Sequence, residues 1–446
     1  MLNKISKPKD LAKYIFNRIT GTKTTPPPLI VINKLIECLF YTSMKTEESN
    51  LLKVTITLID PLNPDPKPPL RIVADRWQYI KFENPIPYTI ASLVKLSKAA
   101  DPWSSSLAVF YDENMNLFIW GMIDQSVHYQ SFLNYETESG AEQPGLFQSS
   151  ITGIGNIIVL FDYELIANLK QDKLVTKYID VLRLGPISSL LKEKVSPFKL
   201  KIEKELKDEY SFDSIIEWND WIDVIFRETL SRLLLRIQNY KHGGAILFTN
   251  NNSDDLDIKY KAKYIRIPSS IVDLIKQTII NYNASNIIME RLDDQKKTIS
   301  SSLYLDEQIS ENEKKDTYDE LKGAIRFIAS QTGVDGLVLF NEQFESEGFG
   351  VVLKTKDLPE KIFISSTAKG STVSLTPSDP NHFGTRHRSM FSYCWKHKGS
   401  FGFVVSQDGD IRAVTRVNEK LVVWENIKTQ HFLRSSKIRR PSPSLK

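Results

Sequence analysis

The chain has 446 residues, which is enough for two domains, and 41% of them are apolar, which allows a sizeable core in each. Its 58 basic and 54 acidic residues leave a net charge of +4, which argues against a protein that coats nucleic acid or a membrane surface through its overall charge. Two cysteines, Cys38 and Cys394, exclude a disulfide framework and a four-thiolate zinc site, and they are typical of a reducing cytoplasm, where we expect the protein.

The first half of the chain has the pattern of a mixed α/β domain. A short basic helix is expected over residues 8–18, and the prolines Pro26–Pro28 then begin an extended stretch. The apolar spacing predicts an amphipathic helix over Thr89–Ala100, and the runs Leu107–Tyr111 and Leu117–Met122 predict a hairpin. The remaining expected elements are strands over Val54–Ile59, Leu70–Ala74 and Gly155–Phe161, and a helix that begins with Tyr163–Leu169.

The domain boundary is expected in the segment Leu191–Asp213, which is charged and has no regular apolar pattern. This gives an N-terminal domain over 1–215, a C-terminal domain over 216–430 and a basic, disordered tail over 431–446. No segment has the roughly 18 uninterrupted apolar residues that a transmembrane helix needs, so no membrane partner is expected.

The second half predicts a mixed β-sheet flanked by helices. A strong amphipathic helix over Ile222–Ile237 leads into the strand Ala245–Phe248. Residues 291–318 are rich in charged and polar side chains and predict a mobile insertion or a solvated helix. The other expected elements are the strand Ile258–Ile267, the helix Ser269–Tyr282, the helix Tyr318–Ser330 and the strand Leu337–Phe340.

The most informative motif is Gly384-Thr385-Arg386-His387-Arg388, directly before an expected helix with an apolar face. Thr385 is a natural N-cap, which places both arginines and His387 in the first turn. Positive side chains there oppose the helix dipole, so the motif favours a bound anion. Exposed N–H groups and two guanidinium groups would form a phosphate site. The alternative is a surface basic triplet without a ligand.

A second motif, Asp335-Gly336, precedes the expected strand Leu337–Phe340. A carboxylate in this position can hold a divalent metal against phosphates, and it can help to deprotonate a hydroxyl nucleophile. The alternative is an ordinary Asp-Gly turn.

The order of these elements resembles the diadenylate cyclase domain, the family that includes the DNA-integrity scanning protein. The order is a helix, a Gly-Gly-Ala-Ile-Leu strand, a helix, an Asp-Gly strand, the Gly384–Arg388 motif with its helix, and a Val-Val-Ser-Gln hairpin. The resemblance covers about residues 222–424. It implies that two ATP molecules are joined into cyclic di-AMP with release of two pyrophosphates, across a homodimer or a higher oligomer.

The resemblance also implies roles for individual residues. Mg²⁺ or Mn²⁺ would be the cofactor, with Asp335 as its ligand. Leu337 stands where the family usually has alanine, and 51 positions separate Asp335 from Arg386, a longer spacing than the family suggests, so a hairpin is expected around Val351–Ser365. The implied catalytic residues are Asp335, Arg386, His387 and Arg388, and the implied nucleotide-binding residues are Gly336, Leu337, Gly384, Thr385 and Ser389.

The N-terminal half resembles, more loosely, the DACNV type of sensor domain that precedes some diadenylate cyclase domains. The residues that carry this resemblance are Leu93–Ser97, Asp101-Pro102 and Ile119-Trp120-Gly121. The sequence thus predicts a cyclase regulated by an N-terminal sensor.

Two other functions remain open at this point. The nucleotide pocket of the second half could sense a nucleotide or a cyclic dinucleotide without turnover. The tail could bind nucleic acid through Lys437, Arg439 and Arg440, but it is short and the rest of the chain is nearly neutral, so nucleic acid is not an expected partner.

Overall fold

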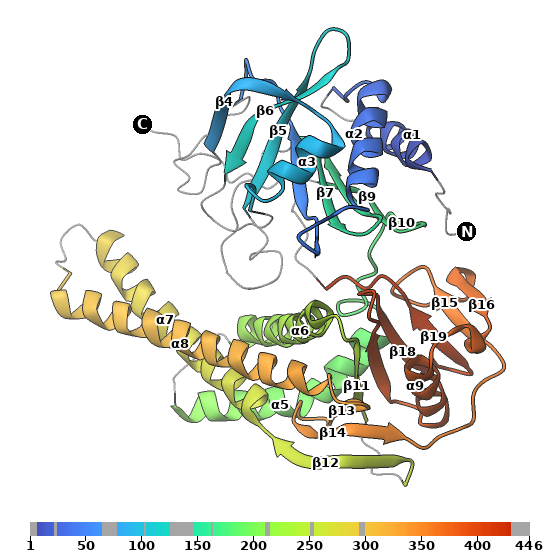
Figure 1. The fold of residues 1–446 in the computed structure, drawn as a ribbon. Helices are drawn as coiled ribbons and strands as arrows, with labels where there is room; N and C mark the ends of the chain where they lie inside the picture. The colour runs from blue at the N-terminus through green and yellow to red at the C-terminus, as the bar shows by residue number, and fades with distance from the viewer. Residues whose placement is uncertain are drawn as a thin grey trace. The chain divides into compact units, whose positions relative to one another are not determined.

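The chain forms two compact units, one within residues 1–177 and the other spanning Tyr178–Thr429 (Figure 1). Each unit has helices packed on a β-sheet, which confirms the expected α/β fold with two domains. No helix of the described part is both long enough and apolar enough to cross a membrane. The expected strand Leu70–Ala74 and the basic tail lie outside the described residues. The computed structural model describes residues 7–21, 25–64, 78–101, 104–124, 146–161, 164–209, 215–249, 254–293 and 299–429.

The division between the units precedes the boundary expected near residue 215. Helix α5 (Pro186–Glu209) occupies most of the charged segment in which the boundary was expected. Its side chains Ile187, Leu191 and Val195 are buried in the large core of the second unit. These apolar residues are four positions apart, but the charged residues between them hide the helical spacing.

An eight-stranded sheet forms the centre of the first unit. Helices α1 (Pro8–Ile19) and α2 (Leu29–Thr42) pack on one face of it, together with α3 (Ile90–Leu96). The strand order is β10 (Lys173–Val175), β9 (Glu164–Lys170), β8 (Asn156–Phe161), β7 (Gln148–Gly153), β3 (Val54–Leu58), β5 (Ser105–Tyr111), β6 (Leu117–Asp124) and β4 (Gln78–Pro87), and a separate pair is formed by β1 (Thr46–Glu47) and β2 (Asn50–Leu51).

Some expectations for the first unit hold and two are wrong. The β5–β6 hairpin is confirmed, and so is the helix after Thr89, whose Oγ1 accepts the backbone N–H of Ser92 at 3.2 Å. The segment after Pro28 is the helix α2 rather than an extended stretch, because its buried residues recur at helical spacing. The expected helix at Tyr163–Leu169 is the strand β9, which pairs with β8.

The second unit has a nine-stranded sheet. Helices α5, α6 (Ile215–Tyr240), α7 (Arg266–Asp293) and α8 (Ser301–Gln331) contribute to the core on one face, and α9 (Thr385–Lys396) covers the other. Two 3-10 turns, η1 (Thr372–Ser374) and η2 (Pro380–His382), precede α9. The strand order is β12 (Leu256–Tyr264), β14 (Ser346–Leu353), β13 (Leu337–Phe340), β11 (Gly244–Phe248), β17 (Phe401–Val405), β18 (Ile411–Val417), β19 (Lys420–Trp424), β15 (Ile362–Ser365) and β16 (Leu375–Ser378).

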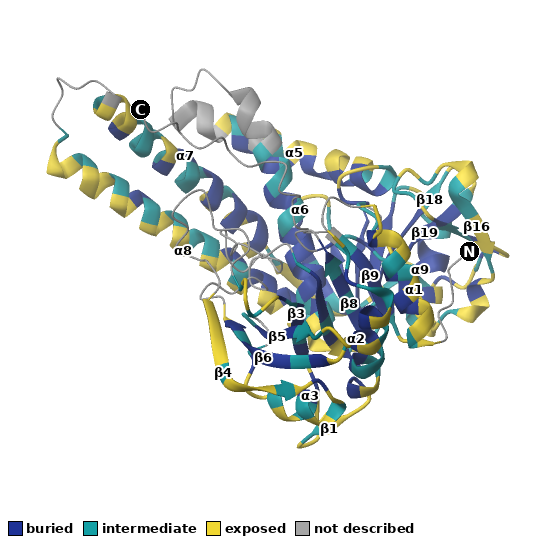
Figure 2. Cartoon of the chain, turned by 90° about the horizontal axis from the view of Figure 1, so that it is seen from above, coloured by how far each residue is buried: buried dark blue, intermediate teal, exposed yellow. Residues whose placement is uncertain are grey.

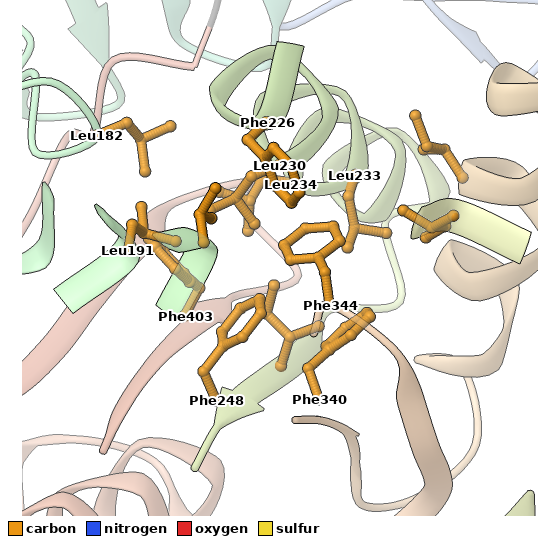
Figure 3. Packing of buried hydrophobic residues seen from close by; sticks show 14 of the residues in the cluster. Leu182, Leu191, Phe226, Leu230, Leu233, Leu234, Phe248, Phe340, Phe344 and Phe403 are labelled. Atoms are coloured by element: carbon orange, nitrogen blue, oxygen red, sulfur yellow. The ribbon is translucent and has the colours of Figure 1, made fainter. Parts of the chain in front are cut away.

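The central strand β11 is buried on both faces. Ile246 and Phe248 belong to the core under α6, whereas Ala245 and Leu247 belong to the core under α9. The ring of Phe248 lies 5.0 Å from that of Phe340 and 4.8 Å from that of Phe401, centroid to centroid. Figure 3 shows Phe248, Phe340 and Phe344 beneath the leucines of α6. Stacked buried rings fix the positions of neighbouring strands, so the carboxyl ends of β11 and β13 are held side by side.

Helices α7 and α8 form a long antiparallel pair, with exposed positions recurring along α8 (Figure 2). Residues 291–318 were expected to form a mobile insertion or a solvated helix, and from Ser301 onward they form a solvated helix. The hairpin expected around Val351–Ser365 is wrong. Strand β14 pairs with β13 and β12, whereas β15 pairs with β16 and β19 at the other end of the sheet.

Candidate functional site

The Gly384–Arg388 motif forms the start of α9. Gly384, rather than the expected Thr385, is the N-cap, with φ −64° and ψ 165° and no capping side chain. Its carbonyl oxygen accepts the N–H groups of His387 at 3.0 Å and Arg388 at 3.1 Å. Thr385 is therefore the first helical residue, and it is exposed, as are Gly384 and Arg388. Ser389 is half-buried. The first turn has no acidic residue, so the positive end of the helix dipole faces an arginine-rich surface.

Arg386 reaches the turn that precedes β11. A methyl group on Gly243 would lie 2.8 Å from Nη1 of Arg386, 3.0 Å from the carbonyl oxygen of Val405 and 3.4 Å from the backbone nitrogen of Gln407. Gly243 also has a φ of +70°, which other residues seldom adopt. Glycine at this position thus lets the guanidinium group approach the backbone at the end of β17. Sequence reasoning missed Gly243, although the Gly243-Gly244 pair before a buried strand was a visible signal.

His387 is buried, and its Nε2 lies 3.2 Å from Nη1 of Arg412 on β18. A guanidinium group only donates hydrogen bonds, so Nε2 is the acceptor and the imidazole is neutral. Burial, reinforced by the charges of Arg412 and Arg386, lowers the pKa of His387 from its usual 6.5 to about 4. In this environment His387 adds no positive charge to the site near neutral pH.

Arg412 is the residue of this network that sequence reasoning missed. Its Nε donates to Oε1 of Glu425 at 2.8 Å, its Nη2 lies 3.4 Å from Oδ2 of Asp410, and its guanidinium carbon lies 5.6 Å from the ring centre of Phe383. The side chain is only 10% exposed. An arginine inside the otherwise apolar start of β18 was the available signal, because buried charges need partners.

The buried His387 leads to a prediction about stability in mild acid. Above pH 6.5 the imidazole is neutral in both the folded and the unfolded chain. Between pH 6.5 and about 4 the unfolded chain takes up a proton that the folded protein does not, so the free energy of unfolding falls as the pH falls. We expect a loss of about 3 kcal/mol across this window. Urea denaturation at pH 7 and pH 4.5 should show a smaller loss for H387Q than for the native protein, and equal losses would contradict the prediction.

Asp335 lies in the turn before β13, and its side chain is exposed. Its carboxylate makes no hydrogen bond or ion pair with any described residue, and the same is true of the guanidinium groups of Arg386 and Arg388. Gly336 follows with a φ of +118°, and a methyl group on it would lie 2.6 Å from the carbonyl carbon of Gly350, so only glycine fits.

Leu337 points away from this surface. Its side chain is 5% exposed and belongs to the core between the sheet and α9. The position at which the family usually has alanine is therefore a packing position here. Of the predicted nucleotide-binding residues, Leu337 is the one placed in the core rather than at or near the surface.

Strand pairing brings the two motifs to one edge of the sheet. Strands β11 and β13 are parallel, with Ile246 opposite Val338, so the turns before them lie at the same edge. A methyl group on Gly333 would lie 3.2 Å from Nε2 of His242, which places the Asp335 turn beside the Gly243 turn. Since Arg386 contacts Gly243, the 51-residue spacing between Asp335 and Arg386 is bridged by the sheet.

The described residues contain no group of three or more His, Cys, Asp or Glu side chains that could hold a metal ion. Asp335 is a single exposed carboxylate without a partner among them. This arrangement fits Mg²⁺ or Mn²⁺ that arrives with a nucleotide, because such ions are commonly bound by one or two carboxylates together with substrate phosphates.

Comparison with known proteins assigns part of the first unit. No curated protein matches the chain. Residues 22–124 match the family model described as probable sensor domain DACNV. The matched segment runs from before α2 to the end of β6. It includes all three motifs that carry the resemblance, Leu93–Ser97, Asp101-Pro102 and Ile119–Gly121. The first unit thus contains a segment that is similar to the DACNV sensor domain.

Proposed function

We propose that the second unit is a diadenylate cyclase domain, which joins two ATP molecules into cyclic di-AMP and releases two pyrophosphates. The observation that carries the proposal is that strand pairing brings the Asp335 turn beside the Gly243 turn, which Arg386 contacts, and that neither side chain has a partner among the described residues. Arg388 lies in the same helical turn as Arg386 and is exposed. Free guanidinium groups at a helix N-terminus suit a polyphosphate. The DACNV match supports the same function, because such sensor domains are associated with diadenylate cyclases.

The chemistry assigns a role to each group. The 3′-hydroxyl oxygen of each ATP attacks the α-phosphorus of the other, a new P–O bond forms, and the bond to the pyrophosphate oxygen breaks. Asp335 accepts the hydroxyl proton. Arg386 and Arg388 stabilise the charge on the phosphate oxygens, with the N–H groups of Gly384 and Thr385 nearby. When bound with the nucleotide, Mg²⁺ or Mn²⁺ neutralises phosphate charge, and Asp335 would hold it.

His387 and Gly336 act indirectly in this proposal. The neutral imidazole accepts a hydrogen bond from Arg412 and so holds the first turn of α9 against β18. Gly336 keeps the Asp335 turn close to the backbone of β14. Both residues position the groups that contact the nucleotide.

The reaction needs two copies of the domain, because each copy brings one nucleotide and the two must face each other. A homodimer or a higher oligomer is therefore the proposed active form. The first unit would regulate it as a sensor, and the cytoplasm is the proposed location.

The test is mass spectrometry of the full-length protein incubated with ATP and either Mg²⁺ or Mn²⁺. The native protein is expected to produce cyclic di-AMP and pyrophosphate. Asp335→Asn has nearly the same shape but no proton-accepting carboxylate, so its product should fall below a hundredth of the native amount, in line with the usual contribution of a general base. Asp319→Asn, on the exposed side of α8, is the matched control and should leave the product unchanged.

Failure of this test has two forms. If the native protein binds ATP but releases no pyrophosphate, the second unit is a nucleotide sensor rather than a cyclase. If it neither binds nor converts ATP with either metal, the assignment of a nucleotide site to this edge of the sheet is wrong.

A further inference from the structure

A cavity of about 590 Å³ that is open to solvent lies at the surface of the first unit, between α2 and the start of α3. Two of its lining residues, Lys34 and Tyr41, are exposed. Its volume is in the range of sites for small molecules. One wall is a single face of α2, since Lys34, Glu37, Cys38 and Tyr41 recur at three and four residues. The other walls come from residues 87–90 and 116–118, at the ends of β4 and the β5–β6 hairpin.

Three hydrogen bonds join these walls. Lys34 donates from Nζ to the carbonyl oxygen of Met115 at 2.7 Å, across to the hairpin. Tyr88 donates from its hydroxyl to the carbonyl oxygen of Leu35 at 3.2 Å and from its backbone N–H to that of Leu117 at 2.9 Å. The cavity is thus held open by the fold, so a ligand would meet a preformed site with little ordering cost.

The cavity carries one acidic and one basic side chain that do not pair with each other. The Glu37 carboxylate is half-buried and makes no hydrogen bond or ion pair with any described residue. A half-buried carboxylate without a partner favours the binding of a cation. Lys34 uses one of its three N–H donors on Met115, so two remain for an anion.

The other residues that line the cavity limit the kind of ligand that it can bind. Tyr41, Ile90 and Phe118 give the cavity an apolar and aromatic side. Cys38 also lines it, but burial raises the pKa of its thiol to about 11. The thiol is therefore protonated near neutral pH and is poorly suited to covalent capture, thiol oxidation or metal binding.

We propose that this cavity binds a small zwitterion with an apolar body, of the chemical class of free amino acids. The ammonium group of the ligand pairs with Glu37, its carboxylate pairs with Lys34, and its body packs against Tyr41 and Phe118. All four residues belong to the segment 22–124 that matches the DACNV sensor domain. The site is independent of the nucleotide chemistry proposed for the second unit, so either proposal can fail without the other.

The test uses the full-length protein and each of the twenty free L-amino acids as probes, with isothermal titration calorimetry and thermal melting. At least one amino acid with an apolar or aromatic side chain is expected to bind. Its N-acetyl and carboxamide derivatives each lose one charge and are expected to bind about tenfold more weakly or worse. Absence of both a binding heat and a melting shift for all twenty would overturn the proposal.

Variants of the lining residues then test whether the amino acid binds in this cavity. Glu37→Gln and Lys34→Met should each weaken binding about tenfold. Glu113→Gln and Lys53→Met make the same charge changes at exposed positions of the first unit outside the cavity, and they should bind as the native protein does. Native affinity in both cavity variants overturns the proposal. The comparison of derivatives uses the native chain, so the test does not depend on how well a variant folds.

Discussion

Replacing Arg386 with methionine is expected to lower the rate of cyclic di-AMP formation by about a hundredfold to a thousandfold. Methionine retains most of the apolar stem but removes the guanidinium group that lies beside Gly243 and the end of β17. Removal of one group that stabilises charge in the transition state typically costs a factor of this size, and arginines that act on transferring phosphoryl groups can contribute more. The measurement is the initial rate of product formation at saturating ATP, by quantitative mass spectrometry.

Two further variants test whether the loss of rate comes from the guanidinium group of Arg386. Arg386→Lys keeps the charge but not the planar pair of donors, so its rate should fall between those of the native protein and Arg386→Met. Arg326→Met removes an exposed arginine from α8 and should leave the rate unchanged. A native rate for Arg386→Met would show that Arg386 does not contact the reacting phosphates.

The parts of the site that lie in continuous sequence could be predicted, because local chemistry determines them. Gly384–Arg388 precedes a helix whose apolar residues recur at helical spacing, and the structure has that helix over Thr385–Lys396. The strand after Asp335-Gly336 was equally clear, because Leu337–Phe340 is a short apolar run buried on both faces.

The parts that depend on strand register could not be predicted. The contact between His387 and Arg412 exists because β18 lies beside β17 beneath α9, and no local pattern gives that register. The closeness of Gly243 to Arg386 depends in the same way on the pairing of β11 with β17. The strand β9 shows a related limit, because a short apolar run reads equally well as a helix or a strand until its partner β8 is known.

Replacing Arg412 with methionine is expected to lower the free energy of unfolding of the second unit by about 3 kcal/mol. Arg412 is 10% exposed, and its Nε donates to a Glu425 carboxylate that is 18% exposed and has no other cation among the described residues. Removal of one partner of a buried ion pair leaves an uncompensated charge, which is why the effect is large. His387 also loses its donor, so its pKa should rise toward the ordinary value.

A double variant separates the cost of the stranded carboxylate from the loss of packing. Arg412→Met combined with Glu425→Leu removes both charges and should recover part of the stability lost by Arg412→Met alone. Urea denaturation followed by circular dichroism gives the free energies, and NMR of labelled histidine gives the pKa of His387. An unchanged free energy in the single variant would contradict the prediction. The double variant could regain stability while the pKa of His387 stays near its ordinary value. That result would assign Arg412 a second role, because its guanidinium group would then keep the His387 imidazole neutral independently of the ion pair with Glu425.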